Sequence, residues 1–335
     1  MKGKIPKRNE LEQKVFSISN EEAFVSIALE VYHFQYNNNS VYQNYCNIIN
    51  RTPATVHHID HIPFLPISFF KTHEIVTGSF EPQLVFKSSG TTGVSQSTHY
   101  VKKAGLYEKS FLVCFEQFFG PVGDYCIIGL LPSYLEKGQS SLVYMVDYLV
   151  KKSGHNQSGF YLYDFEKLAK TLHDLERSGQ KTILFGVTYA LLDFAAQFPV
   201  SLKNTIIIET GGMKGRREEL TRNELYDELR KAFDIAKVHS EYGMTELLSQ
   251  AYAVNGLFYS PVWMKVLLRD ETDPLSVLPE NATTSGAINI IDLANLYTCS
   301  FIATDDVGKK QKDGSFEILG RMDNSDIRGC SLMVL

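Results

Sequence analysis

A run of hydroxyl-bearing residues and glycines, Ser88-Ser89-Gly90-Thr91-Thr92-Gly93, follows the short apolar stretch 84–86. Glycine adopts backbone dihedrals that are closed to other residues, so successive amide and hydroxyl donors can converge on one anion. The run therefore predicts a phosphate cradle. It is not a Walker A loop, because residues 94–97 read Val-Ser-Gln-Ser and supply no Lys-Ser/Thr pair. A solvated turn is the alternative for these six residues taken alone.

Three further motifs follow this run along the chain. They are Glu241-Tyr242-Gly243-Met244-Thr245-Glu246, Thr304-Asp305-Asp306 and Gly320-Arg321-Met322-Asp323. The four motifs, in this order, resemble the signatures of the adenylate-forming superfamily, whose members join a carboxylate to AMP with the use of ATP and magnesium. A match of four ordered motifs is far more specific than a match of any one.

Within that superfamily, the chain most resembles the acyl-protein synthetases of the LuxE type, the fatty-acid-activating subunits of the bacterial luciferase fatty acid reductase. The segments that carry this resemblance are 62–71, 131–135 and 326–332. It extends over nearly the whole chain. It implies an α/β fold like the N-terminal domain of adenylate-forming enzymes, with ATP and Mg²⁺ as cofactors.

The resemblance also implies how the phosphates and the metal are held. The residues from Ser88 to Gly93 would grip the β- and γ-phosphates of ATP. Thr245 would hydrogen-bond the α-phosphate, and Glu246 would ligate magnesium, which prefers one or two carboxylates together with phosphate oxygens and waters. The alternative for this pair is an ordinary helix start with Thr245 as its cap. Gln96 stands where many superfamily members have a lysine, so the loop has lost one positive charge.

The adenine is expected at Gly211 and Gly212, which follow the apolar run 206–208. Glycine lets a base approach the backbone closely, although an ordinary strand-to-helix turn is the alternative for this pair. Tyr242, followed by Gly243, would stack on the adenine face.

The ribose is expected at the third and fourth motifs. Asp306 would accept hydrogen bonds from both ribose hydroxyls, and Arg321 would pair with the ribose or the α-phosphate. The superfamily has Thr-Gly-Asp where this chain has Thr304-Asp305-Asp306. The register of the motif favours Asp306 over Asp305.

Cys330 lies near the end of the chain between a glycine and a serine. A cysteine on a flexible terminal segment can swing into an active site, and Arg328 would favour its thiolate. In the acyl-protein synthetases that the chain resembles, a cysteine in this position receives the acyl group. A structural cysteine in a last strand 330–335 is the alternative.

The superfamily normally carries a small mobile C-terminal domain after the Gly-Arg-x-Asp motif, with a lysine that contacts the reacting groups. The sequence stops at Leu335, so we expect this domain and its lysine to be missing. Either another residue supplies the positive charge, or adenylation is slower, or a partner contributes.

Composition narrows the functional classes. The 335 residues carry a net charge of -5 without a basic stripe, which argues against nucleic-acid binding. No apolar run is long enough to span a membrane, and the N-terminus lacks a signal-peptide core, so we expect a cytoplasmic protein.

The five cysteines show no Cys-x-x-Cys spacing, which argues against disulfides and zinc; we expect four of them to be buried. His57, His58 and His61 lack a spaced partner for a metal site.

Alternating patterns predict the elements that position these motifs. Helices are expected over 20–36, where residues 19–22 suggest a capping box, and over 41–49, 104–119, 140–151, 165–177, 189–198 and 216–233. Strands are expected over 98–101, 125–131, 182–185, 205–208, 235–239, 258–268, 287–291 and 301–304.

Continuous apolar strands between helices predict largely parallel sheets covered by helices, followed by a distorted β-rich portion. The expected division is a helical and connector region over 1–80, an α/β nucleotide-binding core over 81–255, and a β-rich portion with the acyl-acceptor tail over 256–335.

The predicted function is ATP-dependent activation of a fatty or related carboxylic acid as acyl-AMP, followed by transfer to Cys330 as a thioester. Its catalytic residues would be Cys330, Glu246, Thr245 and Arg321. A reductase or an acyltransferase partner would then accept the acyl group. Two alternatives stay open: a free-standing acyl- or aryl-CoA ligase, and a nucleotide-binding subunit that no longer catalyses.

Overall fold

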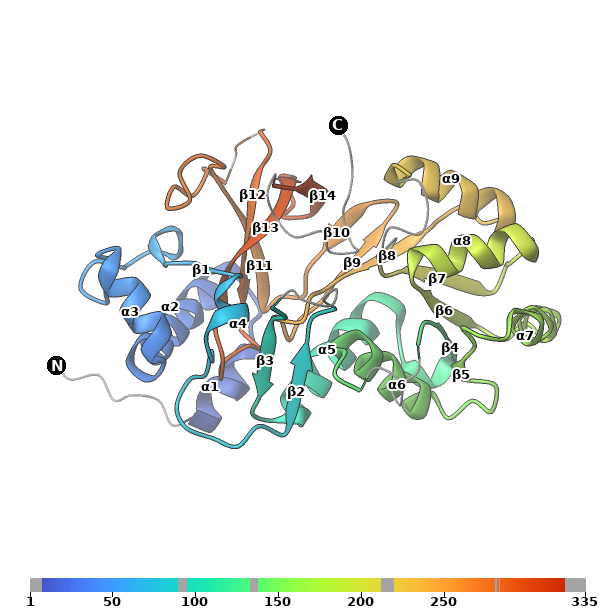
Figure 1. The fold of residues 1–335 in the computed structure, drawn as a ribbon, viewed down its shortest axis with the longest axis horizontal. Helices are drawn as coiled ribbons and strands as arrows, with labels where there is room; N and C mark the ends of the chain where they lie inside the picture. Colours follow the sequence, from blue (N-terminus) through green and yellow to red (C-terminus); the bar gives the residue numbers. More distant parts are fainter. Residues whose placement is uncertain are drawn as a thin grey trace. The chain divides into compact units, whose positions relative to one another are not determined.

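The computed structural model describes residues 8–89, 95–132, 138–211, 220–280, 282 and 284–322. The chain forms two compact units, each assembled from segments that are distant in sequence (Figure 1). The first unit comprises Met1–Phe111, Met244–Gln250 and Ser260–Phe316. The second comprises Leu112–Gly243, Ala251–Tyr259 and Glu317–Leu335.

The second unit is built on a sheet whose parallel strands follow the order β5-β4-β6-β7-β8. These strands are β4 (Cys126–Leu130), β5 (Gly159–Phe160), β6 (Thr182–Gly186), β7 (Thr205–Glu209) and β8 (His239–Tyr242). The antiparallel strands β9 (Ala251–Val254) and β10 (Leu257–Tyr259) continue the sheet beyond β8, and β14 (Phe316–Arg321) lies beside β10. Every residue of β4 and β6 is buried, as the continuous apolar runs predict for parallel strands covered on both faces.

Helices cover both faces of the parallel strands (Figure 1). One hydrophobic cluster joins alternate residues of β4, β6 and β7 to α7 (Phe165–Ser178), α8 (Thr188–Gln197) and α9 (Arg222–Phe233). Helix α6 (Ser141–Ser153) lies on the opposite face. Helix α5 (Ala104–Phe119) contains the boundary between the two units. This arrangement is the helix-covered, largely parallel α/β sheet that the sequence predicts.

The first unit contains an antiparallel sheet of β11 (Met264–Arg269), β12 (Gly286–Asp292) and β13 (Phe301–Lys310), with β1 (Leu65–Pro66) parallel to β13. A separate hairpin pairs β2 (Leu84–Lys87) with β3 (Thr98–Val101). The N-terminal helices are α1 (Arg8–Val15), α2 (Glu21–Asn38), α3 (Ser40–Ile48) and α4 (Phe69–Thr72). This antiparallel sheet is the β-rich portion expected near the C-terminus.

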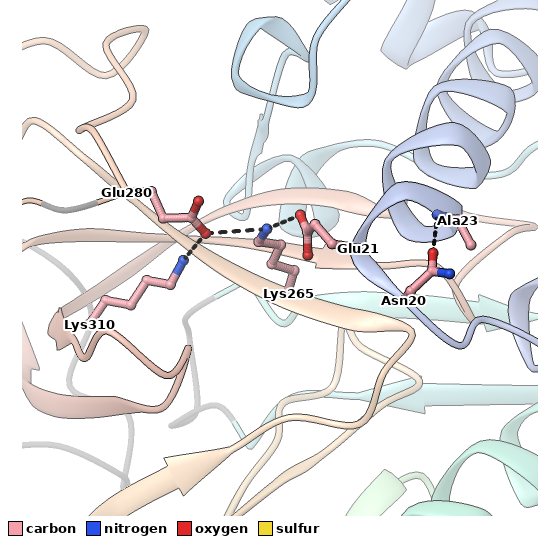
Figure 2. Close-up of polar contacts among 6 residues, drawn as sticks. All are labelled: Asn20, Glu21, Ala23, Lys265, Glu280 and Lys310. Atoms are coloured by element: carbon pink, nitrogen blue, oxygen red, sulfur yellow. Dashed lines mark hydrogen bonds and ion pairs between the residues drawn. The ribbon is translucent and has the colours of Figure 1, made fainter.

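Helix α2 is fixed at its start by a cap and an ion network (Figure 2). The Asn20 side chain accepts a hydrogen bond from the Ala23 amide at 2.9 Å, so the cap is Asn20 rather than Ser19. Lys265 of β11 pairs with Glu21 and lies 3.5 Å from Glu280, which also pairs with Lys310 at 3.1 Å. The network joins the helix to the antiparallel sheet.

Two strand predictions require correction. The strand expected at 235–239 begins only at His239, because Asp234 ends α9 in the left-handed conformation and β8 pairs with β7 from His239 onward. The strand expected at 258–268 is two strands, β10 and β11, separated at Pro261, which cannot donate to a ladder. The described part of the helix expected at 216–233 begins at Arg222, after the Thr221 cap.

Among the residues that the structure describes, no helix combines the length and the apolar character that crossing a membrane requires.

Candidate active site

The predicted phosphate cradle follows β2. Of its six residues the structure describes Ser88 and Ser89, whereas Gly90, Thr91, Thr92 and Gly93 lie outside the described residues. The Ser88 amide donates to the carbonyl of Ser97 at 3.0 Å, and the Ser97 amide donates to the Ser88 hydroxyl at 2.9 Å. The β2–β3 pairing thus extends to Ser88 and brings the two ends of the segment 89–96 together.

His99 joins β3 to the turn that carries Thr245. Its Nδ1 lies 2.7 Å from the Thr245 carbonyl oxygen, which can only accept, so Nδ1 carries a proton. Its Nε2 lies 3.0 Å from the Thr298 hydroxyl and 3.1 Å from the Asn295 side-chain oxygen. The ring is completely buried, and burial lowers the pKa of His99, an effect that its hydrogen bond to Thr245 and the negative charge of Glu246 partly oppose. Sequence reasoning had assigned His99 no role beyond a place in a strand.

Two further buried polar residues hold the Thr245–Glu246 turn and the segment that follows it. Asn295 donates its amide to the Glu246 carbonyl at 2.8 Å. The Asp292 carboxylate accepts hydrogen bonds from the amides of Leu248 and Ser249 at 2.7 and 2.9 Å. No helix begins at Thr245, because the chain from 243 to 250 runs through turns between β8 and β9. The alternative of a helix start capped by Thr245 is therefore wrong.

The Glu246 side chain is completely buried, and Thr245 beside it is half-buried. No cluster of three or more histidine, cysteine or acidic side chains suited to a metal occurs in the described part of the chain. A nucleotide-bound magnesium ion does not need such a cluster, because phosphate oxygens and water complete its shell around one or two carboxylates. A single carboxylate at Glu246 fits that donor set.

The Thr304-Asp305-Asp306 motif forms a β-bulge in β13. Ala287 pairs with Val307, and Asn289 pairs with Ala303. Ile288 alone therefore lies opposite the three motif residues. Bulges redirect side chains out of the regular ladder and are frequent next to active sites. Asp306 is buried and Asp305 is half-buried.

In the second unit, Glu209 at the end of β7 holds the turn predicted to receive adenine. Its buried carboxylate accepts hydrogen bonds from the Thr188 hydroxyl and, at 2.5 Å, from the Gly211 amide. It also accepts from the Ser240 hydroxyl of β8 at 3.2 Å. Gly211 has a φ of 73°, in the region that favours glycine, and Gly212 lies outside the described residues. Glu209 therefore links three strand or helix ends, a role that sequence reasoning missed.

The Ser240-Glu241-Tyr242 segment of β8 continues this region. Burial raises the pKa of Glu241 to about 8, and the nearby Glu209 carboxylate contributes to the rise. Tyr242 is buried and packs edge-on against Phe258, with ring centroids 5.8 Å apart. Gly243 follows the strand.

The predicted site residues are divided between the two units. The first unit holds Ser88, Ser89, Thr245, Glu246 and Asp306, and the second holds Gly211, Tyr242, Gly243 and Arg321, the last residue of β14. Within the first unit, the His99 contacts join the strand that follows the cradle to the Thr245–Glu246 turn. Cys330 lies outside the described residues.

Comparison with known proteins identifies the family to which the chain belongs. The family model described as acyl-protein synthetase, LuxE, matches residues 135–335, which include the Tyr-Gly-x-Thr-Glu, Thr-Asp-Asp and Gly-Arg-x-Asp motifs and Cys330. The chain belongs to the LuxE acyl-protein synthetase family. No curated protein matches this LuxE-family sequence.

Solved structures confirm the fold. ATP-bound MatB from Rhodopseudomonas palustris matches with a TM-score of 0.51 at 20% identity, over 72% of the LuxE-family chain and 49% of MatB. The LuxE-family chain therefore spans about half the length of that relative. A 2-hydroxyisobutyryl-CoA ligase in complex with 2-HIB-AMP matches with a TM-score of 0.62 at 12% identity, over 92% of this chain and 69% of the ligase. The LuxE-family chain thus has the α/β fold of adenylate-forming enzymes.

Proposed function

We propose that this LuxE-family protein activates a fatty or related apolar carboxylic acid with ATP and transfers the acyl group to its own Cys330. In the first step, a carboxylate oxygen attacks the α-phosphorus of ATP, the bond to pyrophosphate breaks, and acyl-AMP forms. In the second step, the Cys330 thiolate attacks the acyl carbon and AMP leaves. A reductase or an acyltransferase partner then accepts the acyl group from the thioester.

The observation that carries this proposal is the family match over residues 135–335, a range that contains three of the four nucleotide motifs and the acceptor cysteine. The likeness to solved structures with bound ATP or bound 2-HIB-AMP supports the first step. Positioning and electrostatics do most of the work in such a displacement, because the protein has to align the carboxylate with phosphorus and offset the charge on the departing pyrophosphate.

The residues of the Thr245–Glu246 turn suit the phosphate end of this reaction. Glu246 would hold magnesium, and Thr245 would donate its hydroxyl to the α-phosphate. Magnesium, when bound, neutralises charge on the phosphate oxygens. The hydrogen bonds from His99 and Asn295 to the carbonyls of Thr245 and Glu246 hold the turn in place without using either side chain.

The other four cysteines are poor acyl acceptors, and this supports Cys330. Cys46, Cys114, Cys126 and Cys299 are all buried. Burial raises the pKa of Cys46 to about 12 and that of Cys126 to about 11, and it also raises the pKa of Cys299. A thiol with such a pKa supplies almost no thiolate at neutral pH, and the thiolate is the nucleophile.

A CoA ligase is the second candidate, because one of the fold relatives described above is a 2-hydroxyisobutyryl-CoA ligase. A subunit that binds nucleotide without catalysis is the third, since Gln96 replaces the loop lysine of many superfamily members.

Acid-dependent exchange of labelled pyrophosphate into ATP tests the first step. We expect exchange with fatty acids and none without acid. Absence of exchange with every acid tried would favour the non-catalytic subunit. If exchange occurs and coenzyme A is acylated while the protein remains unlabelled, the CoA ligase becomes the better account.

A further inference from the structure

Arg269, the last residue of β11, makes a set of hydrogen bonds to the Thr304-Asp305-Asp306 bulge. Its side chain is deeply buried, with the residue only 4% exposed. One terminal nitrogen donates to the Thr304 carbonyl at 2.6 Å. The other donates to the Ile288 carbonyl at 2.8 Å and to the Asn289 side-chain oxygen at 2.9 Å. The guanidinium thus bridges β12 and β13 at the point where their register shifts.

Thr304 connects the hydrogen bonds of Arg269 to the backbone of Asp306. Its hydroxyl donates to the Ile288 carbonyl at 2.9 Å and accepts a hydrogen bond from the Asp306 amide at 3.2 Å. The Thr304 carbonyl is held by Arg269, and the Thr304 hydroxyl is held on Ile288. Because both groups of Thr304 are fixed, the direction in which the Asp306 side chain leaves the backbone is fixed as well.

The burial of Arg269 against Asn289 lowers the stability of the fold. A guanidinium can only donate hydrogen bonds, so Arg269 pairs with the side-chain oxygen of Asn289. The side-chain nitrogen of Asn289 therefore points away from Arg269. That nitrogen is buried and has no hydrogen-bond acceptor among the described residues. Burying a charge and leaving a donor without an acceptor both destabilise a protein. The protein holds this charged residue here although its burial costs stability, which favours a role in positioning the bulge.

The charges around the bulge suit such a role. Burial lowers the pKa of Arg269, and the nearby Asp305, Tyr45 and Asp306 oppose this effect. An arginine keeps its charge even when buried, so it offsets two neighbouring carboxylates.

We propose that Arg269 is a positioning residue that sets the Asp306 carboxylate to receive the ribose hydroxyls of ATP. The inference rests on the proposed function, which assigns the ribose to Asp306. Arg269 does not touch the nucleotide; it acts through Thr304. Its loss therefore weakens recognition of the ribose more than recognition of the rest of ATP.

The test compares equilibrium binding of ATP and 3′-deoxy-ATP to the full chain. One hydrogen bond to a charged group makes wild type prefer ATP by about 10- to 100-fold. Arg269→Lys cannot reproduce the planar fork of donors, and Thr304→Val removes the hydroxyl while keeping the branched shape. In both variants we expect the preference to fall by at least about fivefold, because most of one such hydrogen bond is lost.

Glu280→Gln is the matched control, since it disturbs the ion pairs of Glu280 with Lys265 and Lys310 (Figure 2) rather than the hydrogen bonds of the bulge. The preference of the Glu280→Gln variant for ATP over 3′-deoxy-ATP should equal that of wild type. If Arg269 serves stability alone, both nucleotides will bind to a smaller folded fraction with an unchanged preference, which would overturn the inference.

Asp306→Asn separates this inference from the proposed function. If Asp306→Asn abolishes the preference while Arg269→Lys and Thr304→Val keep it, the positioning role is wrong and the ribose assignment stands. If Asp306→Asn keeps the preference, the ribose assignment itself fails and the inference fails with it. Acid-dependent pyrophosphate exchange by wild type tests the proposed reaction independently of either result.

Discussion

The Nδ1 atom of His99 lies 2.7 Å from the carbonyl oxygen of Thr245, residues that are 146 positions apart in the sequence. The contact ties the strand that follows the predicted phosphate cradle to the turn that bears the predicted magnesium ligand. Because the imidazole is buried, the carbonyl has no water to replace the lost donor if the ring is removed. His99 should therefore matter to activity although it does not contact substrate.

His99→Leu removes the donor, and we expect it to lower acid-dependent pyrophosphate exchange by about tenfold or more, the effect of losing one to two kcal/mol of positioning. His99→Asn keeps a side-chain amide donor and should retain more of the activity. Magnesium titration checks the cause. If the contact positions Glu246, His99→Leu will need more magnesium for half-maximal exchange. If His99→Leu has an unchanged magnesium requirement and a lower melting temperature, His99 only stabilises the fold.

Glu246→Gln tests the magnesium ligand directly. An amide is a weaker ligand than a carboxylate and carries no charge, so we expect exchange to fall by about 10²-fold or more while the fold is kept. Glu81→Gln, at an exposed glutamate of the same unit, serves as control and should behave as wild type. Exchange at the wild-type rate in Glu246→Gln would remove this residue from the site.

Glu241 should make stability depend on pH. Its pKa is raised from 4.5 in the unfolded chain to about 8 in the fold, so the folded state keeps a proton that the unfolded state has released. Between these two values unfolding releases a proton, and stability falls as the pH rises, by at most about 1.4 kcal/mol per pH unit. The contribution is constant below pH 4.5.

Glu241→Gln abolishes this titration. We expect the denaturation midpoint of the variant, relative to wild type, to rise steadily from pH 5 to pH 8. Glu166→Gln, at an exposed position of α7, should show a difference that does not change with pH. A pH-independent difference for Glu241→Gln as well would mean that Glu241 is ionised throughout in the folded protein.

The burial of four cysteines predicts which thiol an alkylating reagent modifies in the native protein. Cys46, Cys114, Cys126 and Cys299 are buried, so iodoacetamide at neutral pH should not modify them in the native protein. We expect one labelled thiol per chain, and none in Cys330→Ser. Peptide mapping by mass spectrometry identifies the site. Label on any of the four buried cysteines would weaken the argument that singles out Cys330 as acceptor.

Much of the fold follows from local patterns. The helix predicted over 104–119 is α5, with those bounds, and the continuous apolar runs at β4, β6 and β7 are buried parallel strands. The start of β8 was missed because pairing with β7, rather than the apolar residues Ile235, Ala236 and Val238, decides where that strand begins. Strand limits set by a neighbouring strand are not encoded in local periodicity.

The candidate site was predictable only in part. Motif residues such as Thr245 and Asp306 carry a recognisable sequence signal, but the residues that hold them do not. Arg269 reaches Thr304 across 35 positions, and Asn295 reaches the carbonyl of Glu246 across 49. The available signal was a polar side chain in or directly after a predicted strand, as at His99 or Arg269, because such a residue must find partners when it is buried.

The central claim is that Cys330 receives the acyl group from acyl-AMP, and acyl labelling of the protein tests it most directly. The full chain is incubated with ATP, magnesium and a labelled fatty acid, and the protein is then treated with neutral hydroxylamine, which cleaves thioesters but not amides. We expect wild type to carry label that hydroxylamine releases. Cys330→Ser should still form acyl-AMP but carry little or no such label, because a hydroxyl without an adjacent base is a far weaker nucleophile than a thiolate. Label that persists unchanged in Cys330→Ser, or a wild-type enzyme that acylates only coenzyme A, would contradict the account.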